Sequence, residues 1–401
     1  MLTPAEAEKL IGENLLTFLR EDCPLSLAHG RVLREDLVAD RDLPPFDRVT
    51  MDGYALRSAA LAGGTTLFRI EATQAAGMRA FTLGPGEDAC VEVMTGAVLP
   101  EGADCVVPYE DTQRDGSIMK VVTLASAGPG SSVHRRGSDH RAGDVMVRAG
   151  TKLSGREIAV AAAVGSSTLV VSAQPRIAVV ATGDELVEVD ASVASHQIRR
   201  SNDHAIRAAL ISAGYTRVER FHLRDVRHEI EHRLWHIIAE HDVVLITGGV
   251  SKGKFDFLPS VLDAQGVKKI FHGVAQRPGK PFWFGVTLRR TPVFALPGNP
   301  VSAYTCLHRY VLPALAQASG LSSVAPRLAA LTAAVTFKAA LAYYLPVRLS
   351  SGPGAELLAT PDASNTSGDF AGLIRTDGFV ELPANQVEFA AGFVTTFRPW
   401  V

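Results

Sequence analysis

The sequence predicts a multidomain α/β plus β protein. The chain has 401 residues, which is longer than one hydrophobic core usually supports. Strand and helix patterns alternate over residues 176–325, as in a mostly parallel sheet that helices cover on both faces. Short β-type runs and glycine-rich turns fill residues 44–143 and 326–401, and this pattern is typical of β domains.

The first predicted element is an amphipathic helix from Thr3 to about Arg20. Thr3-Pro4-Ala5-Glu6 is a capping box with proline at the first helical position. Apolar residues then recur at helical spacing at Leu10, Ile11, Leu15, Phe18 and Leu19. A second, alanine-rich helix is predicted over Glu157–Val164, ahead of a domain boundary near Pro175.

Alternating patterns define the α/β region. The predicted strands are Ile177–Ala181, Val218–Leu223, Val243–Thr247, Phe282–Val286 and Val293–Leu296. The predicted helices are Asp203–Ala213, Val226–His241, Leu258–Ala264 and Val301–Ala318. The last region predicts a small barrel or sandwich with strands at Leu331–Phe337, Tyr343–Leu349, Glu356–Thr360, Phe379–Leu382 and Phe393–Phe397.

Bulk composition narrows the function classes. The formal net charge of −2 gives no overall positive field, so we expect neither nucleic acid nor a membrane as partner. The N-terminus lacks a signal-peptide pattern and no apolar run is long enough to span a bilayer, so a cytoplasmic location is expected. The four cysteines are widely spaced and indicate neither disulfides nor a thiolate zinc site.

His228-Glu229-Ile230-Glu231-His232 matches the zinc-protease pattern H-E-x-x-H. On a helical wheel, the apolar residues lie on one face and the histidines on the opposite face. We therefore predict a solvated helix surface and not a zinc site in a cleft.

Three polar turns follow predicted strands of the sheet, at Thr182–Glu185, Gly248–Asp256 and Leu296–Ser302. Their glycines allow backbone N–H groups to approach a ligand, and helix N-termini that follow such turns attract anions. Glu185 and Asp256 are suited to a hard cation such as magnesium. One such turn alone is more often an ordinary connection; together, the three predict a site for phosphate and a divalent metal.

The β module between residues 44 and 143 has its own polar cluster. Asp52 lies in a tight-turn motif, Thr95 precedes a glycine, and Arg136 stands three residues before Asp139. Turn chemistry with surface salt bridges is an equally good explanation for each residue taken alone.

Several motifs occur in a fixed order. They are MDGYA (51–55), MTGA (94–97), PEGAD (100–104), RRG (135–137), TGDEL (182–186), GGVSKGKFD (248–256), PGKP (278–281) and LPGNPVSA (296–303). In this order, they resemble the molybdopterin molybdenumtransferases of the MoeA and gephyrin E-domain family.

The resemblance implies four domains. They are an elongated linker domain (1–43 and 144–175), an inserted mostly-β domain (44–143), a molybdopterin-binding α/β three-layer domain (176–325) and a C-terminal β-barrel-like domain (326–401). It also implies a homodimer whose active site lies across the subunit interface. Such enzymes insert molybdate into adenylylated molybdopterin with Mg²⁺ and release AMP.

Residue roles follow from the motif matches. The implied catalytic residues are Asp52, Thr95, Arg136, Asp139, Glu185, Asp225, Asp256 and Lys280, of which Glu185, Asp225 and Asp256 would hold the metal. The implied substrate-binding residues are Thr182, Gly183, Asp184, Ser201, Asn202, Gly248, Gly249, Val250, Ser251, Lys252, Arg277, Pro297, Gly298, Asn299 and Pro300.

Two other functions remain open at the sequence level. A molybdopterin adenylyltransferase would use the same α/β domain, although that activity has no need of the two β domains. A non-catalytic scaffold of the gephyrin type is the other, and it has no use for three acidic residues at a metal site. Transient contact with the adenylyltransferase that makes the substrate is also expected.

Overall fold

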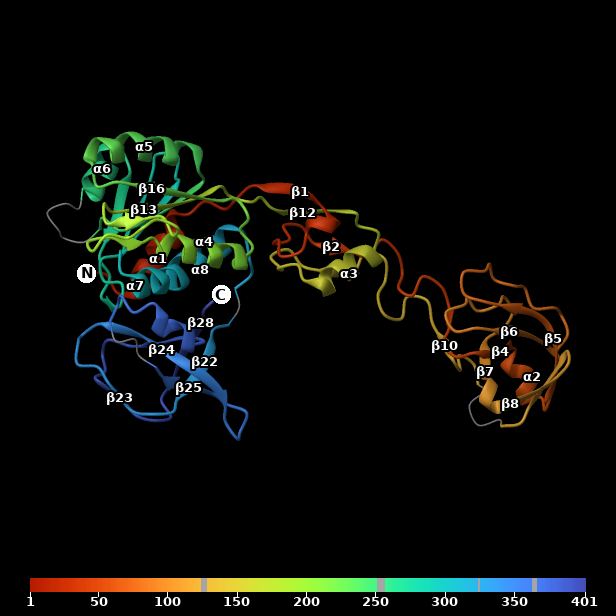
Figure 1. Ribbon diagram of the computed structural model, residues 1–401. Helices are drawn as coiled ribbons and strands as arrows, with labels where there is room; N and C mark the ends of the chain where they lie inside the picture. Colours follow the sequence, from red (N-terminus) through yellow and green to blue (C-terminus); the bar gives the residue numbers. More distant parts are fainter. Residues whose placement is uncertain (124–127, 251–256, 324, 363–365) are drawn as a thin grey trace. The chain divides into compact units, whose positions relative to one another are not determined.

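The computed structural model describes residues 1–123, 128–250, 257–323, 325–362 and 366–401 (Figure 1). The chain forms two compact units. The first unit consists of Met1–Glu35, Gly150–Ser154 and Thr168–Val401, and the second unit consists of Asp36–Ala149 and Gly155–Ser167. No helix among the described residues is long and apolar enough to cross a membrane.

A six-stranded sheet is the centre of the first unit. Its strands are β13 (Ile177–Thr182), β16 (Val218–Leu223), β17 (Val243–Thr247), β18 (Lys268–His272), β20 (Trp283–Val286) and β21 (Pro292–Leu296). They lie in the order β16-β13-β17-β21-β20-β18. The first four are parallel, and β20 and β18 are antiparallel to their neighbours. The carboxyl ends of β13, β17 and β21 therefore meet at one edge.

Helices cover both faces of this sheet and confirm the three-layer prediction (Figure 1). On one face, α1 (Pro4–Asn14), α4 (Asn202–Ala213), α7 (Pro300–Cys306) and α8 (Leu312–Ala318) pack on residues such as Val179 and Phe294. On the other face, α5 (Arg227–Glu240) and α6 (Leu258–Ala264) pack on residues such as Val180 and Ile246.

Two predicted helices have different limits in the structure. Helix α1 ends at Asn14 and not near Arg20, because Leu15 is extended and the Phe18 N–H donates to the Ala318 carbonyl at 2.7 Å. The helix predicted over Val301–Ala318 contains a π-helical turn at Leu307–Val311. Pro313 follows this turn and has no N–H to donate to the carbonyl four residues earlier, which accounts for the widened turn.

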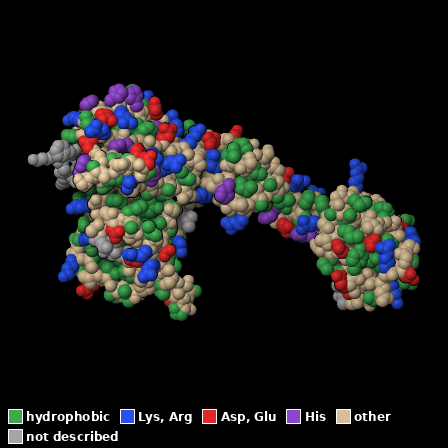
Figure 2. Space-filling model, viewed as in Figure 1, with side chains coloured by type: hydrophobic (Ala, Val, Ile, Leu, Met, Phe, Trp, Pro, Cys, Tyr) green, Lys and Arg blue, Asp and Glu red, His purple; other side chains and the backbone are tan. Residues whose placement is uncertain are grey.

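The histidines of α5 are exposed, as the helical wheel predicts. His228, His232 and His236 lie on the solvent side, whereas Ile230 and Leu234 are buried. Figure 2 shows histidines gathered on the surface over this helix. Within the described residues, no group of three or more potential ligands is placed to hold a metal ion.

The C-terminal region is a closed β-barrel, as predicted. Its strands are β22 (Arg327–Leu331), β24 (Ala342–Ser351), β25 (Leu357–Pro361), β26 (Gly378–Leu382) and β28 (Val394–Pro399), and β26 pairs with β24 to close it. β19 (Gln276–Arg277) adds to β24 from the α/β domain. The strand predicted over Leu331–Phe337 is wrong: a bend at Thr332 separates β22 from β23 (Val335–Thr336).

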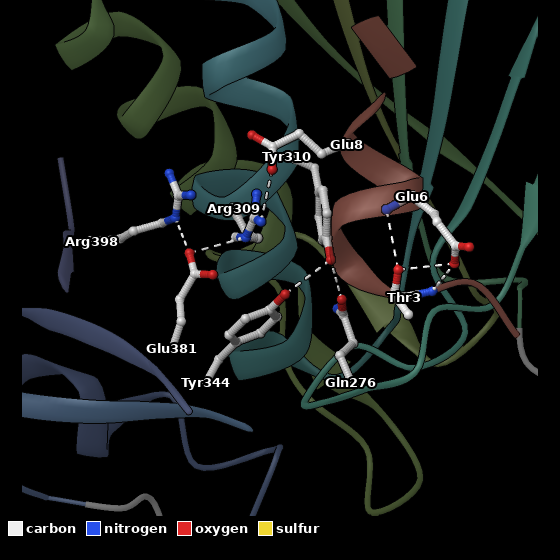
Figure 3. A network of polar contacts seen from close by, with 9 residues as sticks. All are labelled: Thr3, Glu6, Glu8, Gln276, Arg309, Tyr310, Tyr344, Glu381 and Arg398. Atoms are coloured by element: carbon white, nitrogen blue, oxygen red, sulfur yellow. Dashed lines mark hydrogen bonds and ion pairs between the residues drawn. The ribbon is translucent and has the colours of Figure 1, made fainter. Parts of the chain in front are cut away.

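A buried polar network joins this barrel to the α/β domain (Figure 3). Arg309, 5% exposed, makes ion pairs with Glu8 of α1 at 2.9 Å and with Glu381 of β26 at 3.1 Å. The Tyr310 hydroxyl donates to Gln276 and lies 3.0 Å from the hydroxyl of Tyr344. The barrel is thus joined to the π-helical turn through the buried Arg309 side chain and the largely buried Glu381 carboxylate.

The second unit is mostly β. Its main sheet has the order β7-β4-β6-β5-β9-β8, with apolar clusters around Phe68 and Val91. The strands are β4 (Gly53–Leu56), β5 (Leu67–Gln74), β6 (Ala89–Val93), β7 (Cys105–Pro108), β8 (Thr112–Asp115) and β9 (Ile118–Val121). Smaller pairs join β2 (Leu37–Val38) to β11 (Val145–Val147) and β3 (Arg48–Val49) to β10 (Val133–His134).

Candidate functional site

The three turns predicted from the sequence meet at one cavity in the first unit. Its volume is about 630 Å³, and it lies at the carboxyl ends of β13, β17 and β21. Most of the predicted substrate-binding residues line it: Thr182, Gly183, Ser201, Asn202, Gly248, Gly249, Val250, Pro297, Gly298, Asn299 and Pro300. Glu185 and Asp225, two of the three predicted metal ligands, line it as well.

Asn202 holds two of the turns in place. Its side-chain amide donates to the Thr247 hydroxyl at 2.9 Å and to the Gly298 carbonyl at 2.7 Å. The Thr247 hydroxyl in turn donates to the Pro297 carbonyl at 3.2 Å. The first residue of α4 therefore ties the end of β17 to the turn after β21, and the positive end of the α4 dipole lies at the cavity.

Gly248 allows the turns after β13 and β17 to approach each other. Its φ is +100°, and a Cβ there would lie 2.7 Å from both the carbonyl and the hydroxyl oxygen of Thr182. The Thr182 hydroxyl is buried and has no hydrogen-bond partner within the described residues. A buried hydroxyl of this kind at a cavity wall is suited to a ligand oxygen or a water molecule.

Gly183 creates the space for the first acid. A Cβ at Gly183 would lie 2.6 Å from the Glu185 carboxylate, so the bare backbone allows that side chain to fold over the turn. Mg²⁺ is usually bound by one or two carboxylates together with phosphate oxygens of the substrate. Glu185 and Asp225 at one cavity fit that donor set.

The C-terminal barrel also contributes to the cavity. Gly368 lines it, and Ser367 accepts a 2.7 Å hydrogen bond from the Asn299 side chain through its hydroxyl. A neighbouring cavity of about 320 Å³ contains Arg277 and Lys280, and it shares Pro281 with the first. The predicted cations therefore lie beside the main cavity and not on its wall.

Other predicted residues are placed differently. The Asp184 carboxylate accepts hydrogen bonds of 3.3 Å from Arg224 and from the Asp225 backbone N–H, and it is absent from the cavity lining. Ser251, Lys252 and Asp256 lie outside the described residues.

A charged cluster in the cavity wall was not predicted from the sequence. Arg199, Arg200 and Asp203 line the cavity, and Asp203 is completely buried. The Asp203 carboxylate makes ion pairs with Arg200 at 3.0 Å and with Arg220 at 3.1 Å. The available signal was the pair Arg199-Arg200, shortly before the helix predicted from Asp203. Nothing in the sequence spacing indicates that Arg220, on β16, completes the cluster.

In the second unit, Asp52 and Thr95 are in direct contact. The Asp52 carboxylate accepts from the Thr95 backbone N–H at 2.6 Å and from its hydroxyl at 2.7 Å. Both hydrogen bonds lower the pKa of the Asp52 carboxyl group, and the bond from the Thr95 backbone N–H has the larger effect. Both residues are exposed, so this hydroxyl and carboxylate are presented to solvent.

Arg136 and Asp139 lie in the turn after β10. Arg136 pairs with Asp42 at 2.8 Å, and the Asp139 carboxylate lies 2.9 Å from the His134 ring. The pairing of β10 with β3 brings this turn to the region of Thr95, because the Val49 carbonyl accepts from the Gly96 N–H at 2.8 Å. Asp139 lies further along this antiparallel path, since its backbone N–H donates to the Leu43 carbonyl at 3.0 Å.

A cavity of about 690 Å³ lies between α1 and α8. None of the ordered motifs lines it. Size alone therefore does not select the site; the convergence of the three turns does.

Comparison with known proteins agrees with this architecture. Family models match residues 2–165 (MoeA N-terminal region, domain I and II), 178–317 (probable molybdopterin binding domain) and 329–400 (MoeA C-terminal region, domain IV). A molybdopterin molybdenumtransferase from Synechocystis sp. is 40% identical over 401 residues, with 100% of both chains covered. The chain belongs to the MoeA family.

Further MoeA relatives support the same assignment. Molybdopterin molybdenumtransferase 2 of Mycobacterium tuberculosis is 30% identical, covering 100% of this chain and 99% of its own. The crystal structure of the molybdopterin biosynthesis MoeA protein from Pyrococcus horikoshii OT3 aligns with a TM-score of 0.85 at 25% identity, covering 100% of both chains. The cavity described above lies in the region matched by the molybdopterin-binding model.

Proposed function

We propose that this MoeA protein is a molybdopterin molybdenumtransferase, which inserts molybdate into adenylylated molybdopterin and releases AMP. The observation that carries the proposal is one cavity in which glycine turns, the N-terminus of α4 and two carboxylates converge. Backbone N–H groups and a helix dipole favour phosphate oxygens. The names of its relatives support the same activity.

In this proposal, the chain's own groups position the substrate. The backbone at Gly248 and Gly249 comes close to the ligand because neither residue has a side chain, and the Asn202 amide keeps the surrounding turns fixed. Glu185 and Asp225 would hold Mg²⁺ from the cavity wall, and the ion would offset negative charge on the phosphates. Rigid placement of this kind lowers the barrier by removing the cost of reorganising the site.

We further propose a homodimer whose active site includes both units. The support is that Asp52, Thr95 and Arg136 are exposed on the second unit, where they can act on a ligand held by another subunit. The proposed partners also include the adenylyltransferase that makes the substrate, in a transient contact, and the proposed location is the cytoplasm.

Mixing two inactive variants tests the shared site. Asp52→Ala and Glu185→Ala subunits, unfolded and refolded together, should recover about a quarter of wild-type activity if each site takes one residue from each subunit. Sedimentation of the same mixture reports whether dimers have formed. If dimers form and no activity returns, the shared site is contradicted.

The reaction itself is tested by following the nucleotide. The protein is incubated with adenylylated molybdopterin and magnesium, with and without molybdate, and AMP is quantified. The proposal expects AMP release that depends on molybdate. Incorporation of AMP from ATP into molybdopterin, without molybdate-dependent release, would instead identify an adenylyltransferase.

A further inference from the structure

Arg200 is a buried cation in the wall of the cavity. Its side chain is 6% exposed, and it lies between β15 (Ile198–Arg199) and α4. One terminal nitrogen, Nη2, pairs with Asp203 at 3.0 Å, and the other, Nη1, pairs with Glu188 at 2.9 Å. Its Nε has no hydrogen-bond partner within the described residues.

The buried part of this cluster carries an excess positive charge. Arg200 and Arg220 share the single carboxylate of Asp203, which is 0% exposed. Glu188 offsets the excess charge in the structure, but its side chain is 57% exposed. A carboxylate in that position is well hydrated and contributes little net binding energy, so it can be replaced.

The geometry of a guanidinium suits this exchange. Carboxylate and phosphate oxygens bind the same planar fork of N–H donors. Asp203 holds Arg200 through Nη2, and Nη1 is the nitrogen that an anion in the cavity could take from the exposed Glu188. Glu188 belongs to the segment between Glu185 and Ile198, both of which line the cavity.

We propose that Arg200 binds a phosphate group of the ligand and that Glu188 is an internal anion that competes for it. In the free protein Glu188 occupies Nη1; when the substrate binds, a phosphate oxygen takes that position. This inference rests on the proposed function, because it assumes that the cavity accepts a phosphorylated ligand. Arg200 is thereby a specificity-determining residue that sequence motifs do not reveal.

AMP binding to the full-length protein, measured by calorimetry, tests the competition. Glu188→Gln removes the competing charge and should tighten AMP binding by about threefold. Arg200→Lys keeps one charge but loses the fork, and it should weaken AMP binding by about tenfold. In the double variant, Glu188→Gln should give no gain, since the group it competes for has changed.

Glu231→Gln is the matched control. Glu231 is a partly exposed glutamate that pairs with Arg227 at 2.8 Å on α5, and it does not line the cavity. It should leave AMP binding unchanged, and thermal unfolding of each variant verifies that the fold is kept. Weaker or unchanged AMP binding by a folded Glu188→Gln variant overturns the proposal, as does a gain of the same size in the control.

The outcome also separates this inference from the proposed function. If the wild type releases AMP with molybdate but Glu188→Gln does not tighten AMP binding, only the role of Arg200 fails. If Glu188→Gln tightens AMP binding but the wild type releases no AMP, the proposed reaction fails and the anion site stands.

Discussion

Gly248 determines how closely two turns of the cavity approach. Its positive φ is unfavourable for any other residue, and the space where a Cβ would lie is already taken by Thr182. Gly266, in the turn after α6, also has a positive φ of +74°, but nothing lies within 4 Å of its Cβ position. An alanine at Gly248 would therefore suffer both backbone strain and steric overlap, whereas an alanine at Gly266 would suffer backbone strain alone.

We expect Gly248→Ala to lower AMP release by on the order of a hundredfold, because displacement of a catalytic turn by about 1 Å has effects of this size. Gly266→Ala should cost about 1 kcal/mol of stability through its backbone alone and leave activity near the wild type. Initial rates and thermal unfolding measure both effects. Equal losses of activity in the two variants would contradict a special role for Gly248.

Many of the residues that line the cavity could be predicted from the sequence, and others could not. Glycines and prolines after strands are local signals, and Gly248, Gly298 and Pro300 all line the cavity. Gly368 and the partnership of Arg200 with Arg220 depend on contacts between distant segments. Asp184 was predicted at the site but does not line the cavity, and its carboxylate pairs with Arg224 instead.

The π-helical turn at Leu307–Val311 interrupts a helix that the sequence predicted as continuous. His308, within it, accepts from the Val401 N–H at 3.1 Å and lies 2.9 Å from the Tyr304 carbonyl. Burial lowers the pKa of His308 to about 4. The unfolded chain, with a pKa near 6.5, therefore binds this proton more readily than the folded chain.

Acid should destabilise the first unit through this residue. Because the folded pKa is depressed, the stability contributed by neutral His308 is present above about pH 6.5 and is lost as the pH falls toward 4. From pH 7 to pH 5, the expected loss is about 2 kcal/mol. His308→Gln should remove this component from the pH dependence.

Urea unfolding followed by tryptophan fluorescence measures the effect, because Trp235, Trp283 and Trp400 all belong to the first unit. A His308→Gln variant with the same loss between pH 7 and pH 5 as the wild type would assign that loss to other groups.

Element limits were the least predictable feature. Leu15 and Phe18 continue the apolar spacing of α1, yet the chain there is extended and Phe18 bonds to the end of α8. β18 was missed because Lys268, Lys269 and His272 break its apolar pattern, although it pairs with β20 at the sheet edge. In both cases, a tertiary contact determines the local structure.

Across the whole molecule, the attachment of the barrel to the α/β domain depends on Arg309. Replacement by leucine removes a partner from Glu381, which is 20% exposed and keeps Arg398, and from Glu8, which is 50% exposed and stays hydrated. We expect a loss of about 2 kcal/mol in the free energy of unfolding of the first unit, mainly from the charge-assisted bond between Arg309 and Glu381. Denaturant titration gives this value.

Arg227→Leu is the matched change at the surface. Its partner Glu231 is 39% exposed, so the loss should stay within about 0.5 kcal/mol. If the two leucine variants cost the same, the buried network of Figure 3 does not stabilise the junction.

The central claim is that the phosphorylated ligand binds where β13, β17 and β21 end. A crystal structure with bound adenylylated molybdopterin tests it most directly. We predict that the phosphates lie in the 630 Å³ cavity, against Gly248, the N-terminus of α4 and the Arg200 guanidinium. Phosphates bound instead in the cavity between α1 and α8, with the three turns empty, would contradict the account.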